Sequence, residues 1–182
     1  MITILDTSAL ITFYKLDGIK FLNSIFQEVY IPLEVEKEFL EEKSDQRLRF
    51  LLNCFDENTW LKKCQTYSDD IIEILKTDPR IDAGEREAIA QYKQLQVDLG
   101  IEDGKINCII DESAARKVAK YMDIKVNGTL YIMAIMHLNG FIDYHEETKR
   151  LKKERRFGDK VIRDALDEAK TNFEKGNIFI YN

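Results

Sequence analysis

Residues 107–122 read NCIIDESAARKVAKYM, which is a short apolar run, an aspartate at position 111 and then a helix-like segment. Short apolar runs are typical of strands that are buried on both faces of a parallel sheet. The N-terminus has the same order, since ITIL at 2–5 is followed by Asp6 and a helical segment at 9–16. Strands that alternate with helices predict an α/β fold, with a central, mainly parallel sheet flanked by helices in three layers.

The rest of the chain adds elements of both kinds. We expect strands at 29–31, 59–64 and 125–126, and helices at 19–26, 33–42, 44–55, 69–76, 85–100, 112–122 and 129–140. Thr7, Ser8 and Ser44 carry the hydroxyls that favour helix caps. The segment after residue 142 is charged and predicts one or two helices, with a last strand at 178–181. We therefore expect a domain at 1–142 and a mostly helical C-terminal extension at 143–182.

Composition narrows the class of protein. The chain has 182 residues and a net charge of −6, which argues against a generic polyanion binder. The N-terminus has no signal-peptide pattern, and no apolar run has the roughly 20 residues that span a bilayer. The three cysteines show no metal-ligand spacing and are interpreted as reduced, mostly buried thiols. We therefore expect a cytoplasmic protein without a membrane segment.

Two acids follow predicted strands directly, Asp6 after ITIL and Asp111 after NCII. Ligands of open α/β sheets bind beyond the carboxyl ends of the strands. An aspartate at this position also caps helices, and for either residue alone the two interpretations are equally good. If Asp111 starts its helix, its side chain lies in line with the apolar positions three, four and seven residues further on.

Glu85 shows the same alignment, since Ala88 and Ile89 lie three and four residues further on. A carboxylate in line with a buried face is unusual, because burying an unpaired charge is costly. A structural interpretation also exists, in which Glu85 interacts with the helix dipole. Glu87 is rotated by roughly 160° on the same helix and is expected to be solvated. On the helix at 33–42, spacing alone does not choose between Glu38 and Glu42.

Four segments carry a resemblance to a known family. They are LDTSALI at 5–11, IPLEVEKEFL at 31–40, IDAGEREAIA at 81–90 and IIDESAARKVAKYMDIKVNGTL at 109–130. Their content and order resemble PIN domains over residues 1–142, within a group related to VapC-type toxin ribonucleases. The resemblance implies that Asp6, Glu38, Glu85 and Asp111 are the metal-binding acids. Many PIN domains carry aspartate at the third position, where this chain has Glu85.

Four clustered carboxylates repel one another unless cations bind, and Mg²⁺ or Mn²⁺ prefers such oxygen ligands. The resemblance implies hydrolysis of RNA or another single-stranded nucleic acid, leaving 5′-phosphate and 3′-hydroxyl ends. Ser8, Ser113 and Thr129 are candidate hydroxyls for orienting an acid or a phosphate, although helix capping is the stronger interpretation of each. The two histidines, His137 and His145, are expected to be structural and exposed, respectively. The basic run at 149–156 is more typical of a solvated helix face than of a nucleic-acid site.

The leading hypothesis is a metal-dependent ribonuclease that acts as the toxin of a toxin–antitoxin pair. Its partners would be RNA, an antitoxin protein and a second copy of the chain in a homodimer. One alternative is a PIN-like module that binds RNA or a protein without cutting. Another is a phospho-acceptor receiver-like domain, which is weaker because Asp6 has no adjacent acid.

Overall fold

The computed structural model of the chain describes residues 1–41, 45–57, 60–64, 69–100, 105–153 and 157–176. Within these residues one sheet contains β1 (Ile2–Leu5), β2 (Glu28–Ile31), β3 (Leu61–Lys63), β4 (Ile106–Ile109) and β5 (Val126–Asn127). The strand order is β3-β2-β1-β4-β5, and every pair of neighbours is parallel. The predicted parallel sheet is therefore confirmed, and β1 and β4 lie side by side at its centre.

The helices follow the predicted segments closely. They are α1 (Thr7–Lys15), α2 (Leu33–Leu40), α3 (Asp45–Glu57), α4 (Asp69–Leu75), α5 (Ala83–Leu99), α6 (Ser113–Tyr121), α7 (Thr129–Leu138), α8 (Tyr144–Lys152) and α9 (Asp159–Glu174). A helix forms within the segment predicted at 19–26, but it is a 3-10 helix, η1 (Ile19–Ser24), the form common in short connectors. The predicted cap Ser44 and the predicted strand at 178–181 lie outside the described residues.

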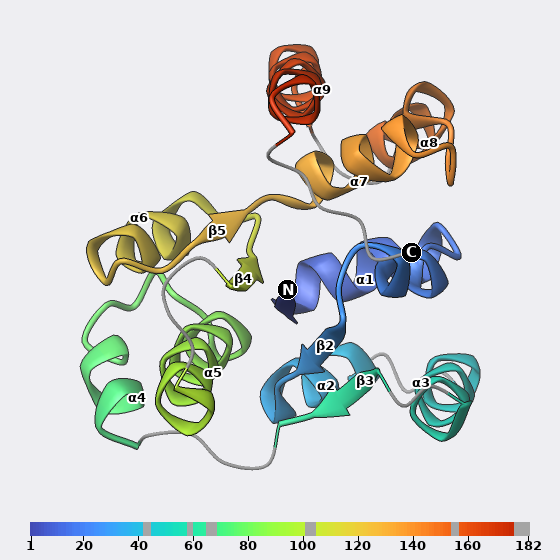
Figure 1. Cartoon of the computed structure of the whole chain (residues 1–182). Coiled ribbons are helices and arrows are strands. Elements are labelled where there is room, and N and C mark those ends of the chain that lie inside the picture. Colours follow the sequence, from blue (N-terminus) through green and yellow to red (C-terminus); the bar gives the residue numbers. More distant parts are fainter. Residues whose placement is uncertain (42–44, 58–59, 65–68, 101–104, 154–156, 177–182) are drawn as a thin grey trace.

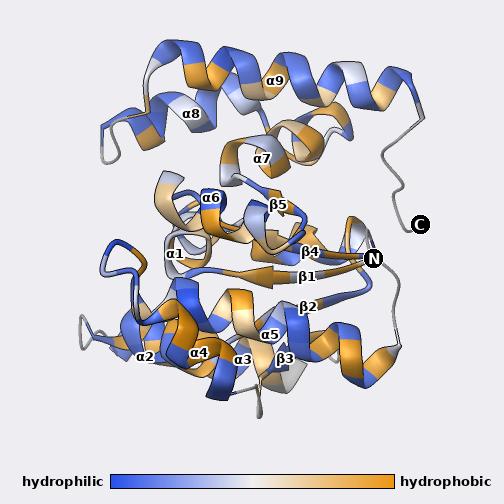
Figure 2. Ribbon diagram, turned by 90° about the vertical axis from the view of Figure 1, so that its left-hand side faces the viewer, coloured by the Kyte–Doolittle hydropathy of each residue, from blue (hydrophilic) through white to orange (hydrophobic). Residues whose placement is uncertain are grey.

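Apolar side chains cover both faces of the sheet. Because side chains alternate along a strand, Leu5 and Ile109 face one core, whereas Ile4 and Cys108 face the other. The first core contains α1 and α7, and the second contains α5 and α6. Figure 2 shows α7, α8 and α9 on one side of the sheet and α5 on the other. The predicted three-layer arrangement is therefore confirmed.

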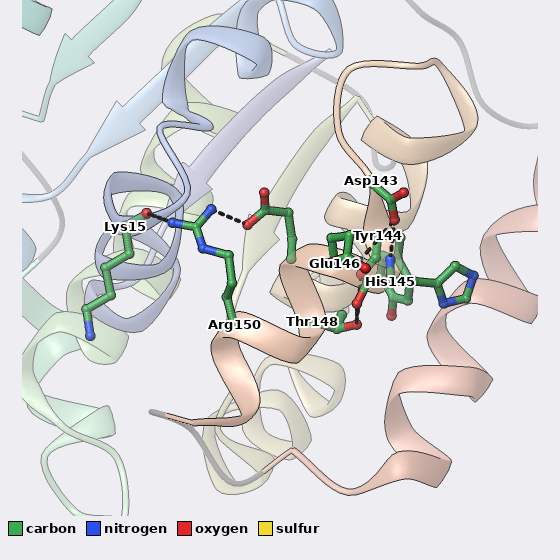
Figure 3. A network of polar contacts seen from close by, with 8 residues as sticks. Lys15, Asp143, Tyr144, His145, Glu146, Thr148 and Arg150 are labelled. Carbon is green, nitrogen blue, oxygen red and sulfur yellow. Dashed lines mark hydrogen bonds and ion pairs between the residues drawn. The ribbon is translucent and has the colours of Figure 1, made fainter.

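The C-terminal helices join the first core rather than standing apart from it. Ile162, Leu166 and Ala169 of α9 are buried in the same cluster as the side chains of α7. The buried Tyr144 hydroxyl donates to the carbonyl of Ile162 at 2.8 Å. Arg150 of α8 reaches the carbonyl of Lys15 at the end of α1 (Figure 3). The boundary at residue 142 stays a prediction, and these contacts show that α8 and α9 share the core of the preceding residues.

Two further expectations concern the cysteines and membrane-spanning segments. All three cysteines, Cys54, Cys64 and Cys108, are buried thiols, as predicted. Among the helices that the structure describes, none has both the length and the apolar composition of a membrane span.

The shared core predicts the effect of a substitution in α9. Replacing the buried Leu166 with alanine leaves a cavity, so Leu166→Ala should lower the free energy of unfolding by about 2–5 kcal/mol. Urea denaturation followed by circular dichroism should show one transition that moves as a whole. Lys170→Ala, at an exposed position of the same helix, is the control and should change stability by under about 0.5 kcal/mol. A separate unfolding transition that is unchanged by Leu166→Ala would contradict a core shared between α9 and the preceding residues.

Candidate active site

The register of the sheet brings Asp6 and Asp111 together. Leu5 of β1 lies opposite Ile109 of β4, and each aspartate comes just after the carboxyl end of its strand. The backbone N–H of Asp111 donates to Asp6 Oδ2 at 3.1 Å. Asp6 is buried and Asp111 is half-buried. The edge predicted to bind a ligand therefore holds both acids in direct contact.

Asp6 also caps α1. Its backbone is extended, with φ −81° and ψ 172°, and its Oδ1 accepts a hydrogen bond from the N–H of Ala9 at 2.6 Å. The prediction that Thr7 and Ser8 cap this helix is therefore wrong. The helix begins at Thr7, so the capping position falls on the aspartate that precedes it.

The Ser8 hydroxyl lies between the two aspartates. Its Oγ is 3.1 Å from Asp6 Oδ1, 3.3 Å from Asp6 Oδ2 and 3.4 Å from Asp111 Oδ2. A hydroxyl has one proton to donate, so it serves only one of these oxygens at a time. Ser8 therefore joins the acid pair, and its interpretation as a helix cap is wrong.

Thr129 orients Asp111. Its backbone N–H donates to Asp111 Oδ1 and its hydroxyl donates to Asp111 Oδ2, both at 2.8 Å. Thr129 is fully buried as the first residue of α7, whose N-cap is Gly128, so Thr129 is not a cap. Helix α6 begins at the exposed Ser113, within the segment predicted at 112–122, so the case in which Asp111 starts the helix does not apply. The N-cap of α6 is Glu112, so the interpretation of Ser113 as a helix cap is wrong, and its role in orienting an acid or a phosphate stays a prediction.

Glu38 comes from α2 and is held by two other elements. Its Oε2 accepts a hydrogen bond from the Thr7 hydroxyl, and its Oε1 accepts one from the N–H of Gly84 at 3.0 Å. A Cβ atom on Gly84 would lie 2.6 Å from Thr7 Oγ1 and 2.7 Å from Glu38 Oε2, so a larger residue would force these two side chains to shift. The structure thus places Glu38 at this edge, whereas Glu42 lies outside the described residues.

Glu85 opens α5 in a capping box. The Asp82 carboxylate accepts from the N–H of Glu85 at 2.8 Å, and Glu85 Oε2 accepts from the N–H of Asp82 at 3.0 Å. The other oxygen, Glu85 Oε1, is buried and has no hydrogen-bond partner among the described residues. The cap accounts for one oxygen of Glu85 and leaves the second available to a ligand.

Glu87 does not point to solvent, so its predicted exposure is wrong. The side chain is only 6% exposed, and its Oε2 accepts a hydrogen bond from the N–H of Glu34 at 2.7 Å. Glu34 lies in the first turn of α2, which packs against α5. The apolar stripe of α5 marks the face that covers the sheet, whereas α2 buries a second face through polar contacts.

We call Asp6, Glu38, Glu85 and Asp111 the acidic edge. Burial, followed by repulsion from Asp111, raises the pKa of Asp6 to about 7, although backbone N–H donors oppose the shift. Burial also raises the pKa of Glu85 to about 7; the N–H of Asp82 opposes the rise, and the acids Asp82, Glu112 and Glu38 add to it in that order. The charges are therefore close enough to repel one another.

The four acids form two pairs rather than a ready-made coordination sphere. Asp6 accepts a hydrogen bond from the N–H of Asp111, and Glu38 accepts one from the N–H of Gly84, the residue before Glu85. In the part of the chain that the structure describes, no three His, Cys, Asp or Glu side chains gather as a metal site. The donor set nevertheless fits a hard divalent cation, because it consists of carboxylate oxygens and includes the unpartnered Glu85 Oε1.

The competing sites have structural explanations. His137 Nδ1 lies 3.2 Å from the carbonyl oxygen of Ile142, and His145 is exposed. In the basic run, Lys149 pairs with Glu146 at 2.8 Å and Arg150 with Glu147 at 2.7 Å, as expected of a solvated helix face. Residues 154–156 of that run lie outside the described residues.

A parallel α/β sheet with acids at its carboxyl edge is an arrangement suited to metal-assisted hydrolysis. A family model described as a PIN domain matches residues 2–171. The chain therefore belongs to the PIN domain family, which generally consists of nucleases, and has a nuclease-type fold. A comparison with curated proteins gives no significant match.

The close approach at Gly84 predicts the cost of a single methyl group. Gly84→Ala places a Cβ against Thr7, Glu38 and Val35, so it should lower the free energy of unfolding by about 1–3 kcal/mol. Gly18→Ala is the matched control, because a Cβ there meets its nearest atom at 3.5 Å. Thermal unfolding of both variants measures the difference. Equal stability of the two variants would contradict the tight contact at Gly84.

The raised pKa of Asp6 predicts a pH dependence of stability in the absence of divalent cations. Its folded pKa of about 7 exceeds the ordinary value of 3.8, so ionisation costs the folded state as pH rises between these values. Asp6→Asn removes that cost. Relative to the unsubstituted chain, its free energy of unfolding should rise by on the order of 1–3 kcal/mol from pH 4 to pH 8.

Urea denaturation in EDTA at several pH values measures this difference. Asparagine keeps the ability to cap α1 but places an amide where an oxygen stood, and that effect does not vary with pH. Asp164→Asn, at an exposed position of α9, is the control and should give a flat difference. A flat profile for Asp6→Asn would show that repulsion and burial do not act on this carboxyl.

Proposed function

We propose that this chain is a divalent-metal-dependent ribonuclease that hydrolyses phosphodiester bonds of single-stranded RNA. The observation that carries the proposal is the contact between Asp6 and Asp111, where the Asp111 N–H donates to Asp6 and the pKa of Asp6 is raised to about 7. Two carboxylates held together at the ligand-binding edge of an α/β sheet repel each other. Both carboxylates would be attracted to a cation bound between them, and this attraction would offset their repulsion.

Asp6, Glu38, Glu85 and Asp111 would hold the Mg²⁺ or Mn²⁺. When bound, such an ion activates water and neutralises charge on a phosphate. The side chains around the acids fix their orientation: Thr129 and Ser8 hold Asp111, and Thr7 and Gly84 hold Glu38. Ser113, exposed at the start of α6, is proposed to face a substrate phosphate.

Protonation is part of the same proposal. With pKa values of about 7, Asp6 and Glu85 carry protons on a large share of molecules at neutral pH when no cation is present. Asp6 and Glu85 would have to release these protons to hold the ion, so the affinity of the site for the ion should rise with pH. Asp6 and Glu85 can therefore act as metal ligands only in the molecules in which they are deprotonated.

The narrower form of this proposal is a toxin of the VapC type, held inactive by an antitoxin protein. A small DNA-binding protein encoded beside this chain would support that role.

One observation favours a second candidate, a PIN-like module that binds RNA or a protein without cutting. The described residues contain no ready-made group of three metal-binding side chains. Calorimetric titration with Mn²⁺ separates the two candidates, because the non-cleaving module has no need of the ion.

The ribonuclease proposal predicts the behaviour of purified protein on a labelled single-stranded RNA. Mg²⁺ or Mn²⁺ should support cleavage to 5′-phosphate and 3′-hydroxyl ends, and EDTA should stop it. Asp6→Asn, Asp111→Asn and Glu85→Gln should each reduce cleavage to the EDTA level, because each removes a carboxylate ligand.

Glu73→Gln is the matched control, because Glu73 lies on α4 with its side chain 70% exposed. It should leave the rate unchanged. Glu87→Gln is unsuitable as a control, since Glu87 is buried against α2. Full cleavage by both aspartate variants, with contaminating nuclease excluded, would overturn the proposal.

A further inference from the structure

Helix α6 begins at the acidic edge and presents a row of cations to solvent. Arg116, Lys117 and Lys120 are exposed, whereas Ala115 and Ala119 are buried against the sheet. Figure 1 shows α6 on the outside of the fold, beside β5. At about 100° per residue, the three cations and the exposed Tyr121 lie within an arc of about 140°. We call Arg116, Lys117, Lys120 and Tyr121 the basic face of α6.

Among the residues that the structure describes, the cations of this face have no acidic partner in an ion pair. Some exposed lysines elsewhere in the described residues pair with a carboxylate, as Lys63 does with Glu36 at 2.6 Å, and others, such as Lys170, do not. Counting only the described residues, neither Arg116, Lys117 nor Lys120 takes part in an ion pair. In a chain with a net charge of −6, three adjacent cations without partners provide a local site for an anion.

Arg116 extends this face to the acidic edge. A Cβ atom placed on Gly128 would lie 3.2 Å from Arg116 Nη1 and 3.5 Å from Asp111 Oδ1. The backbone of Gly128, with φ −90°, is open to any residue, so glycine serves here to leave space. The Arg116 guanidinium and the Asp111 carboxylate, a proposed metal ligand, therefore both lie beside Gly128.

Tyr121 adds an aromatic ring at the other end of the face. It is the last residue of α6 and is 89% exposed, the highest exposure among the large hydrophobic side chains reported for the described residues. Proteins that bind single strands combine cations along the backbone with aromatic rings on which bases stack.

We propose that the basic face of α6 binds single-stranded RNA, with Arg116 on a phosphate beside the cleavage site and Tyr121 stacked on a base further along. This inference rests on the proposed function, because the acidic edge defines where the strand is cut. An acidic protein segment could also bind these cations and the exposed ring, but it would have no reason to bind where the face begins, beside the acidic edge. The row of charge that begins beside Asp111 favours the nucleic acid.

The test measures binding separately from cleavage. A fluorescent oligouridine is titrated at several salt concentrations in the Asp6→Asn background, which is not expected to cut. Arg116→Gln and Lys120→Gln should each weaken binding about tenfold and reduce the salt slope by about 0.7, the value for one single-strand phosphate contact. Tyr121→Ala should weaken binding about tenfold with the slope unchanged, and Tyr121→Phe should restore it.

Arg163→Gln is the matched control. Arg163 is exposed on α9, and the contact between Asn172 and Tyr131 places the opposite end of that helix beside the start of α7. This variant should bind like its parent. The proposal that the basic face of α6 binds RNA is overturned if both α6 cation variants keep the affinity and the salt slope of the parent. It is also overturned if Arg163→Gln loses as much affinity as they do. Both conclusions hold even if the chain cleaves RNA. Loss confined to the α6 variants supports binding by the basic face even if no metal supports cleavage, and in that case only the proposed function fails.

Discussion

The hydrogen bond from the Asp111 N–H to the Asp6 carboxylate is the constraint on which the rest of the site depends. It forms because β1 and β4 are parallel neighbours, so that Asp6 and Asp111, just beyond their carboxyl ends, lie next to each other. The same carboxylate caps α1, which fixes where that helix starts and where Ser8 points. Thr129 holds Asp111 from the opposite side. These donors offset part of the repulsion, and the pKa of Asp6 stays raised because burial outweighs them.

A second pair of acids is tied to the first through neighbouring residues. Thr7, next to Asp6, donates to Glu38, and Gly84, next to Glu85, donates to the same glutamate. Glu85 keeps one buried oxygen without a partner among the described residues. Leaving a buried acceptor without a hydrogen bond costs about 1–3 kcal/mol, so a partner for this oxygen would stabilise the folded state. A divalent cation bound at the acidic edge would interact with this oxygen and would also reduce the repulsion among the carboxylates.

The apolar runs predict the strands, and their alternation with helices predicts the parallel sheet, so the meeting of Asp6 and Asp111 is accessible from sequence. The role of Ser8 is not, because a hydroxyl at the start of a helix suits both a cap and a tertiary contact. The exposure of Glu87 was mispredicted because apolar spacing identifies the face of α5 against the sheet, whereas the face against α2 is buried by polar contacts. The need for glycine at position 84 depends on the approach of α2, which no local pattern encodes.

The most direct test of the central claim is a crystal structure with Mn²⁺, using anomalous scattering to locate the ion. The account predicts a peak at the acidic edge, with oxygens of Asp6 and Asp111 at about 2.0–2.6 Å and with Glu85 Oε1 turned toward the ion or a water bound to it. Absence of the peak in crystals of protein that cleaves RNA, or a peak held by other residues, would contradict it.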